Sequence, residues 1–460
     1  MTYASSSSIE EVAKLFVQEQ GVPGLAVAAV AQTNDGLKIW SAGYGHADIV
    51  QGAPMTPDTS IWLGSVTKAM TGTAIIKAVE QGYLGLESLV DEILQDAGAF
   101  TLGDNETATR FASMTLEHLV THRSDIRDHE DVYQCAYFVG DRNGDKEMLM
   151  DLFGLDNICV EDSPVSLGGY LEAYLSSGGA YYDPAQNFGG RAPGEEESYS
   201  NIASGLAGYL LSLAVNTTLP DYAAREIYEL LGMENTSFRA ADLSRIATPY
   251  IRLEEGEPYT ALPLYDLATF PDGGLRSSAN DMAKFLGCIM NEGTLDHTST
   301  AVTTFDVHSG NDVDEKIVLL QPESVEDLLR PRFGGGTGVF WTWAELGGRL
   351  VVGHDGSDPG AASLMFFDPE TKTGFVVLTN GDDSSFDFEA FLSVGLAALA
   401  RADELVKNLA VDTIETLAPT ATTTQSSLSP TAAPASSALV LSWKEALFCS
   451  VFVWLTHAVL

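Results

Sequence analysis

Hydrophobic residues in the first part of the chain recur at the spacings of a helix and then of strands. Residues 8–20 place apolar side chains at helical intervals, after a serine that suits the N-cap position. Two apolar runs, 24–32 and 37–45, follow on either side of Asp35-Gly36, a dipeptide that favours a tight turn. The pattern therefore predicts a helix followed by a β-hairpin.

The last third of the chain carries three more strand-like runs, at 349–354, 362–368 and 374–380. The gaps between them are too short for crossover connections, so we expect an antiparallel meander. Residues 384–407 then predict a closing helix. Strands at both ends with helices between them predict an α+β fold, with an antiparallel sheet formed by the N- and C-terminal strands and flanked by helices.

This pattern divides the chain into a main domain, 8–407, and two further segments. Inside the domain, residues 127–198 are acidic and rich in Gly, Asp and Tyr, and we expect a long irregular excursion at the rim of a cleft. Residues 408–437 are rich in Ser, Thr, Pro and Ala, as is typical of a linker. Residues 438–460 form an apolar tail, for which a membrane tail, a docking helix and a wrongly assigned gene end all stay open. The first residues lack the basic and apolar regions of a secretory signal, and the compartment is left open.

The charge balance narrows the class of partner. The 460 residues include 64 acidic and 24 basic ones, a formal net charge of −40. A phosphate backbone requires basic surface, so a nucleic-acid partner is excluded, while membrane association through the tail and the oligomeric state stay open. Four cysteines in a chain of this length do not form a disulfide framework, although a bridge between Cys135 and Cys159 remains an alternative.

The first candidate for chemistry is the pair Ser65 and Lys68, at the start of an apolar helix. Residues three apart on a helix share one face, roughly 5–6 Å apart at Cβ. A buried lysine can be driven towards its neutral form and then act as a base for the serine. A chance match of two residues one helical turn apart is the alternative.

Two later stretches carry further candidates. Tyr199 and Asn201 come just before an apolar helix, where a capping turn is the alternative explanation. His354 and Gly356 follow a strand-like run, and glycine there would let backbone N–H groups approach a reacting oxygen. A surface histidine in a β-turn is the alternative for this third stretch.

Together, SVTK, YSN and GHDG in this order resemble the serine β-lactamase and penicillin-binding protein superfamily, on the branch of class C β-lactamases, DD-carboxypeptidases, D-aminopeptidases and related esterases. The resemblance runs from GVPGLAVAAV, which begins at residue 21, to FVVLTNGD, which ends at residue 382. It implies a mostly helical subdomain beside the sheet, with the active site between them. It also implies acyl-enzyme chemistry without a metal or a cofactor.

The resemblance implies a role for each matching residue. Ser65 matches the nucleophile and Lys68 its partner base. Tyr199 matches the tyrosine that relays protons to the leaving group, and Asn201 the side chain that contacts the substrate amide. Which of the lysine and the tyrosine accepts the serine proton is left open.

The third motif matches His354-Asp355-Gly356, in the place of the Lys-Thr-Gly of many members. The oxyanion hole would then consist of the backbone N–H groups of Ser65 and Ser357. A histidine is only partly charged at neutral pH. If Asp355 faced the cleft it would repel a substrate carboxylate, and the alternative is that it points away, because strand residues alternate faces.

A further departure lies in LVTHRSDI, residues 119–126, where relatives more often have a Thr-Ser-Gly turn. Arg123 and Asp125 leave the geometry of that turn open. His118 and His122 have the spacing of a metal-binding pair, but without further ligands we expect a structural role.

The sequence therefore predicts a serine hydrolase that acts through an acyl-enzyme on a small-molecule or peptide-like ester or amide, with an esterase or amidase favoured. DD-carboxypeptidase or β-lactamase activity is the alternative, as is a catalytically idle binding or scaffolding protein of the same fold.

Overall fold

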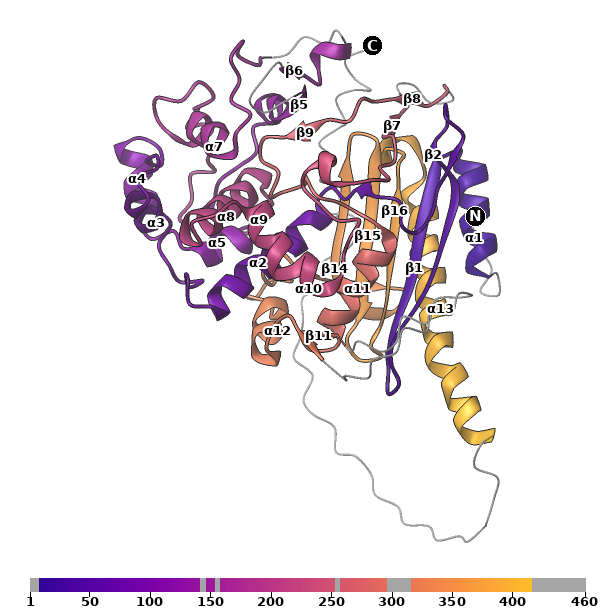
Figure 1. Ribbon diagram of the computed structural model, residues 1–460. Helices are drawn as coiled ribbons and strands as arrows, with labels where there is room; N and C mark the ends of the chain where they lie inside the picture. The colour runs from indigo at the N-terminus through magenta and orange to yellow at the C-terminus, as the bar shows by residue number, and fades with distance from the viewer. Residues whose placement is uncertain (1–7, 141–145, 154–157, 253–256, 296–315, 416–460) are drawn as a thin grey trace, which may run out of the picture.

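The computed structural model describes most of the chain as one α+β arrangement, in which a sheet with helices packed on it lies beside a mostly helical part (Figure 1). The described residues are 8–140, 146–153, 158–252, 257–295 and 316–415. The predicted tail and most of the predicted linker lie outside them. The predicted closing helix is confirmed and continues to Glu415, past the predicted domain end at residue 407.

The main sheet has seven strands, and all of its neighbours pair antiparallel. In spatial order the strands are β13 (Thr342–Leu346), β14 (Arg349–Asp358), β15 (Ala361–Asp368), β16 (Thr373–Thr379), β1 (Gly24–Thr33), β2 (Gly36–Asp48) and β3 (Ala53–Pro54). The N-terminal hairpin joins the C-terminal meander where β1 pairs with β16. The predicted hairpin, meander and junction of the two chain ends are confirmed.

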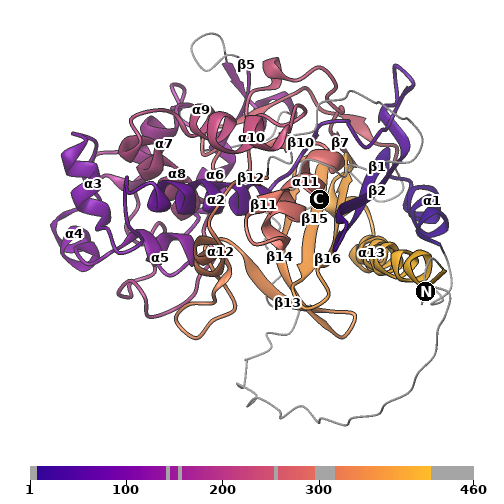
Figure 2. The same cartoon turned by 60° about the horizontal axis from the view of Figure 1, so that its bottom comes forward.

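Helices cover both faces of this sheet (Figure 2). One face packs on α1 (Ile9–Gln20) and α13 (Phe388–Glu415), and the other on α2 (Val66–Glu80) and α11 (Ala279–Met290). The predicted N-cap of the first helix, Ser8, is confirmed, and it forms a reciprocal capping box with Glu11. Alternating strand residues therefore point into two separate apolar cores, one on each face.

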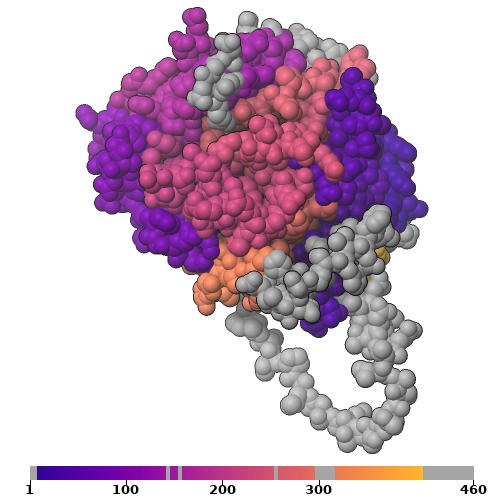
Figure 3. Space-filling view, viewed as in Figure 1, coloured from indigo at the N-terminus to yellow at the C-terminus, as the bar shows by residue number. Residues whose placement is uncertain are grey.

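The remaining helices build a second, mostly helical part beside α2. They are α3 (Val90–Asp96), α4 (Asn105–Phe111), α5 (Leu116–Val120), α6 (Glu130–Tyr133), α7 (Leu167–Leu175), α8 (Asn201–Ala214), α9 (Leu219–Ala223), α10 (Glu229–Leu231) and α12 (Pro322–Leu329). The minor strands are β4 (Ile61–Trp62), β5 (Tyr137–Gly140), β6 (Lys146–Met148), β7 (Tyr250–Ile251), β8 (Thr260–Ala261), β9 (Asp266–Leu267), β10 (Arg276–Ser277), β11 (Thr294–Leu295) and β12 (Ile317–Val318). On the face seen in Figure 3, the pink residues lie between the purple helical part and the indigo N-terminal residues.

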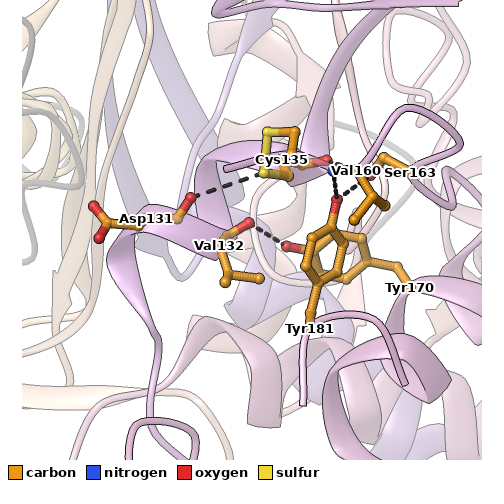
Figure 4. The surroundings of a disulfide bond; sticks show 8 residues. Asp131, Val132, Cys135, Val160, Ser163, Tyr170 and Tyr181 are labelled. Carbon is orange, nitrogen blue, oxygen red and sulfur yellow. Dashed lines mark hydrogen bonds between the residues drawn. A yellow bond between two sulfur atoms is a disulfide. The ribbon is translucent and has the colours of Figure 1, made fainter. Parts of the chain in front are cut away.

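The segment 127–198 differs from the irregular excursion expected of it. It contains α6, β5, β6 and α7, and many of its aromatic side chains are buried in the main core. A disulfide joins Cys135 to Cys159, and Tyr181 next to it donates a hydrogen bond to Ser163 (Figure 4). The buried tyrosines and leucines of α7 do recur at helical spacing, at residues 167, 170, 171, 174 and 175. The Gly- and Asp-rich stretches on either side of them dominate the composition of the segment and favoured an irregular structure.

Among the described residues, no single helix is long and apolar enough to cross a membrane. Residues 201–214 and 219–231 meet the length and composition together, but a bend of 73° separates them.

Candidate active site

Ser65 lies at the N-cap of α2, where a serine often bonds the first turn of its own helix. Here the side chain forms no capping hydrogen bond. Instead, Oγ accepts from Lys68 Nζ at 3.0 Å and from Tyr199 OH at 2.8 Å. The hydroxyl is thus directed away from its own helix and towards two groups that can exchange protons with it.

Lys68 is fully buried, one turn along the same helix. Its ammonium group donates to Ser65 Oγ, to Asn201 Oδ1 at 2.7 Å and to the main-chain carbonyl of Asp272 at 2.7 Å. Nζ also lies 4.8 Å from the centroid of the Tyr199 ring. These contacts explain how a lysine is tolerated on a helix that is otherwise apolar and buried.

Tyr199 and Asn201 come from the start of α8, 134 and 133 residues after their partners on α2. Ser200, between them, is the N-cap, and its Oγ accepts from Ala203 N. The capping turn considered in the sequence is therefore present. It also orients the tyrosine and the asparagine towards Ser65 and Lys68, so the cap and the contacts with α2 are present together.

The backbone of β14 lies directly against the turn that precedes α2. A Cβ atom on Gly356 would lie 2.3 Å from Leu63 O and 2.8 Å from Ser65 N, and one on Gly64 would lie 2.8 Å from Ser357 N. Only residues without a side chain allow this approach. It brings together the two amides, those of Ser65 and Ser357, that the sequence suggested as an oxyanion hole.

His354 lies on the face of β14 that points towards α2. It is buried, and its ring centroid lies 6.3 Å from that of Tyr199. Burial, and then the charge of Lys68, lower the pKa of His354 to about 4. The side chain is therefore neutral at neutral pH, not partly charged as the sequence suggested, because the sequence does not reveal its burial.

Asp355 lies on the opposite side of β14 from His354. It pairs with Leu364, whose side chain belongs to the core under α1 and α13, whereas His354 pairs with Met365 in the other core. Burial, and then the charge of Asp383, raise the pKa of Asp355 to about 6. Asp383 lies just before α13 and bonds the Ser357 side chain. Of the two orientations considered, the one that points away from α2 is therefore observed.

His122 is a site residue whose role the sequence did not reveal. Its ring stacks on that of Tyr199, with centroids 4.4 Å apart, and its Nδ1 accepts from Ser200 N at 3.2 Å. His118, by contrast, bonds Thr115 at the start of α5. The spacing of the two histidines, four residues apart, suggested a metal-binding pair. It gave no indication that His122 contacts Tyr199, which lies far along the chain.

The turn that carries His122 keeps a left-handed backbone at two positions, His122 with φ 56° and Asp125 with φ 66°. Aspartate tolerates this conformation better than most residues. The Asp125 carboxylate accepts from Arg191 N at 2.7 Å, and Arg123 pairs with Glu197 at 3.2 Å. The departures noted in the sequence therefore leave a tight turn in place.

Two buried aspartates near Lys68, Asp272 and Asp358, were also not predicted from the sequence. Asp272 accepts from Tyr133 OH at 3.0 Å, and burial raises the pKa of its carboxyl to about 8. Asp358 accepts from Trp62 and Tyr137, and its pKa is raised by burial to about 6. Each tyrosine comes from the segment 127–198. An aspartate in a glycine-rich turn predicts a surface loop, so the sequence offered no signal for their burial.

The chain thus combines an antiparallel sheet flanked by helices with a Ser-x-x-Lys pair at the start of a buried helix. The family model described as Beta-lactamase matches residues 9–399, and the chain belongs to this family.

Similar proteins were found among curated sequences and solved structures. Protein flp of Staphylococcus aureus (strain NCTC 8325 / PS 47) is 22% identical over 384 residues, 83% of this chain and 64% of that protein. The octameric penicillin-binding protein homologue from Pyrococcus abyssi shares 22% identity, with 85% of this chain and 76% of that chain covered and a TM-score of 0.62. The D-amino acid amidase from Ochrobactrum anthropi SV3, complexed with L-phenylalanine amide, shares 17% identity, with coverage of 87% and 98% and a TM-score of 0.56. These likenesses establish the fold, and the chain spans 64% of the length of protein flp.

Proposed function

We propose that this protein is a serine hydrolase that cleaves an ester or an amide through an acyl-enzyme on Ser65. The observation that carries the proposal is the pair of contacts on Ser65 Oγ, 3.0 Å from Lys68 Nζ and 2.8 Å from Tyr199 OH. A nucleophilic serine needs a neighbour that takes its proton, and both neighbours are within reach.

The reaction follows from this geometry. Ser65 Oγ attacks the carbonyl carbon, its proton passes to the Lys68–Tyr199 pair, and the carbonyl oxygen becomes an oxyanion that faces the amides of Ser65 and Ser357. The pair then returns the proton to the leaving alcohol or amine as the bond to carbon breaks. A water molecule then attacks the carbonyl carbon of the ester on Ser65 and gives its proton to the same pair. As the bond between that carbon and Ser65 Oγ breaks, the pair returns the proton to Oγ, which restores the serine and releases the carboxylic acid. The side chain of Asn201, held by Lys68, would contact the substrate amide.

The charges around the site favour neutral or amine-bearing substrates over carboxylates. Asp355, Asp358 and Asp383 all have a pKa raised to about 6, mainly by burial, so they are largely ionised at neutral pH. Within the described ranges no lysine or arginine forms an ion pair with any of the three. With His354 neutral, the end of β14 would repel a substrate carboxylate and attract an ammonium group. The ligand in the related amidase structure, L-phenylalanine amide, is an amide with such an amino group.

This charge distribution makes an amidase or esterase the better candidate than a β-lactamase or a DD-carboxypeptidase, whose substrates carry a carboxylate. A catalytically idle scaffold is the remaining alternative. Two features of Ser65 argue against that alternative: its hydroxyl does not cap its own helix, and the buried Lys68 donates a hydrogen bond to it. A scaffold would gain nothing from such a buried lysine.

A fluorophosphonate probe tests the proposal directly. We expect one equivalent of probe to attach to the folded protein and peptide mapping by mass spectrometry to locate it on Ser65. The Ser65→Ala variant should remain unlabelled. Folded wild-type protein that reacts with no acylating probe would rule out the hydrolase.

The charge preference is tested with three amides that share one leaving group, the p-nitroanilides of β-alanine, propionate and succinate. We expect the ammonium and neutral compounds to be hydrolysed faster than the carboxylate. Asp355→Thr should raise kcat/KM for the succinyl compound relative to the propionyl compound by about 5- to 10-fold, because one negative charge is removed near the acyl group.

The control for this change is Glu345→Gln, which removes one negative charge from an exposed position on β13 of the same sheet. It should leave the ratio of the two rates unchanged. An equal ratio in Asp355→Thr and wild type would show that Asp355 has no influence on the charge of the substrate.

A further inference from the structure

Asp128 connects the segment 127–198 to the start of α8, where Tyr199 and Asn201 lie. Its Oδ1 accepts from Ser200 Oγ at 2.9 Å and from Ile202 N at 3.0 Å, and its Oδ2 accepts from Asn201 N at 2.8 Å. All three partners donate, so the arrangement favours the ionised carboxylate and opposes burial, which raises the pKa of Asp128. These bonds also satisfy N–H groups that the first turn of a helix leaves unpaired, where a negative charge is favourable.

The position of Asp128 is itself fixed from the other side by α7. Tyr174 OH donates to Arg127 O at 2.8 Å and accepts from His129 N at 2.6 Å, so it holds the chain on both sides of Asp128. Tyr170 OH donates to Val132 O at 2.7 Å. The carboxylate is therefore presented to α8 by a rigid support and not by a free loop.

We propose that Asp128 is a positioning residue of the active site, which fixes the start of α8 and so holds Tyr199 and Asn201 against Ser65 and Lys68. Asp128 touches neither the substrate nor Ser65, and it acts through the two residues that do. This inference rests on the proposed hydrolase function and names a residue that the reaction requires outside the Ser-x-x-Lys, Tyr-x-Asn and His-x-Gly positions.

A second effect of Asp128 is electrostatic. Its charge and that of Lys68 influence each other, and Lys68 lowers the pKa of Asp128, which burial raises. Removing the carboxylate would make the ammonium form of Lys68 less favourable. The other titratable groups near Lys68 are Tyr199, His122, Asp272, His354 and Asp358. The charge of Lys68 also acts on Asp355, on the far side of β14. Those facing Asp128 are Tyr133, Tyr170 and Tyr174, whose pKa values burial raises well above the ordinary value.

The test is Asp128→Asn, which keeps the shape of the side chain. Its amide NH₂ group would point at a hydrogen-bond donor and could not replace the bond that the carboxylate oxygen accepts. We expect kcat to fall by roughly 10- to 100-fold with little change in KM, since small displacements of catalytic groups cost this much. The ascending limb of kcat/KM against pH should move to lower pH, because the ammonium form of Lys68 becomes less favourable. Both are measured on the full chain with the propionyl p-nitroanilide, next to the rate of fluorophosphonate labelling of Ser65.

The matched control is Asp281→Asn on α11. Asp281 is likewise a carboxylate with three donors, from Asn235 N at 2.7 Å, Thr236 Oγ1 at 3.1 Å and Lys284 Nζ at 3.1 Å. It should lower the thermal unfolding temperature without altering the pH profile, and its kcat should stay within twofold of wild type. Ser200→Ala, which removes one of the bonds to Asp128, should lower kcat in the same direction and provides the test if Asp128→Asn does not fold.

The outcomes separate the two proposals. Wild-type protein that takes up no probe on Ser65 would overturn the hydrolase itself. Wild-type protein that is labelled, with an Asp128→Asn variant of unchanged kcat and pH profile, would overturn the positioning role alone and leave Asp128 as a structural cap.

Discussion

Replacing Lys68 with alanine should slow the labelling of Ser65 and the hydrolysis of its substrates by about 10³-fold or more. In the part of the chain that the structure describes, the ammonium group is one of two groups that donate a hydrogen bond to Ser65 Oγ, and it also holds the side chain of Asn201. Its loss leaves Tyr199 as the remaining group that can accept the serine proton, and removes the positive charge that favours a tyrosinate. The measurement is the second-order rate of fluorophosphonate labelling, followed by mass spectrometry of the intact protein.

The matched control is Lys77→Ala, nearer the end of the same helix. Lys77 donates to Leu319 O at 2.8 Å and pairs with Glu80 at 3.3 Å, so its replacement also removes a partly buried lysine and its two contacts. It should change stability but leave the labelling rate within about twofold of wild type, since it lies far from Ser65 on α2. A Lys68→Ala variant that is labelled within tenfold of the wild-type rate would contradict a role as base.

The prediction about Lys68 could be made from the sequence because its partner is local. Residues three apart on a helix meet whatever the rest of the fold does, so Ser65 and Lys68 are adjacent once α2 forms. The sheet could be predicted for a similar reason, because its alternating strands and short gaps leave few ways to pair. Tyr199 and Asn201 lie more than a hundred residues away, and physical reasoning alone left them as a capping turn. Their place in the site followed from the resemblance to a family.

Most of the site residues that the sequence did not reveal lie in turns, and each of these contacts a part of the chain far away in the sequence. His122 and Asp128 lie in a turn with no hydrophobic period, and their partners are on α8, more than 70 residues further along the chain. Asp272 follows a proline and precedes two glycines, which favours a surface turn, yet it is buried beside Lys68. Contacts between turns depend on how complete elements pack, and no local pattern of residues encodes that packing.

The orientation of Asp355 could not be predicted from the sequence either. Alternation along a strand predicts that neighbours such as His354 and Asp355 point to opposite sides, but not which of them faces the site. The cores on the two faces of the sheet decide it, with Met365 opposite His354 and Leu364 opposite Asp355. Because Asp355 lies away from α2, any effect on the substrate acts through charge at the end of β14, together with Asp383, and not through a contact like that of His354.

The second large effect is expected from the smallest change, Gly356→Ala. A methyl group there would lie 2.3 Å from Leu63 O, 2.6 Å from Ser363 Oγ and 2.8 Å from Ser65 N, closer than Cβ atoms approach in practice. The strand must move away from the turn before α2, which separates the amides of Ser65 and Ser357. Because one oxyanion-hole donor contributes several kcal/mol to the transition state, we expect kcat/KM to fall roughly 10²- to 10³-fold.

Steady-state kinetics with a neutral p-nitroanilide and thermal unfolding of the same samples separate this effect from misfolding. Gly336→Ala is the matched control, since a Cβ atom at that glycine would meet nothing closer than Trp343 O at 3.6 Å, an ordinary contact. It should retain wild-type kcat/KM. The methyl group at Gly356 costs stability as well, about 1–3 kcal/mol for an overpacked position, so activity is compared well below the unfolding temperature of the variant. If folded Gly356→Ala keeps kcat/KM within fivefold of wild type, the close approach of β14 to Ser65 does not form the oxyanion hole, and the carbonyl oxygen must be stabilised by other donors.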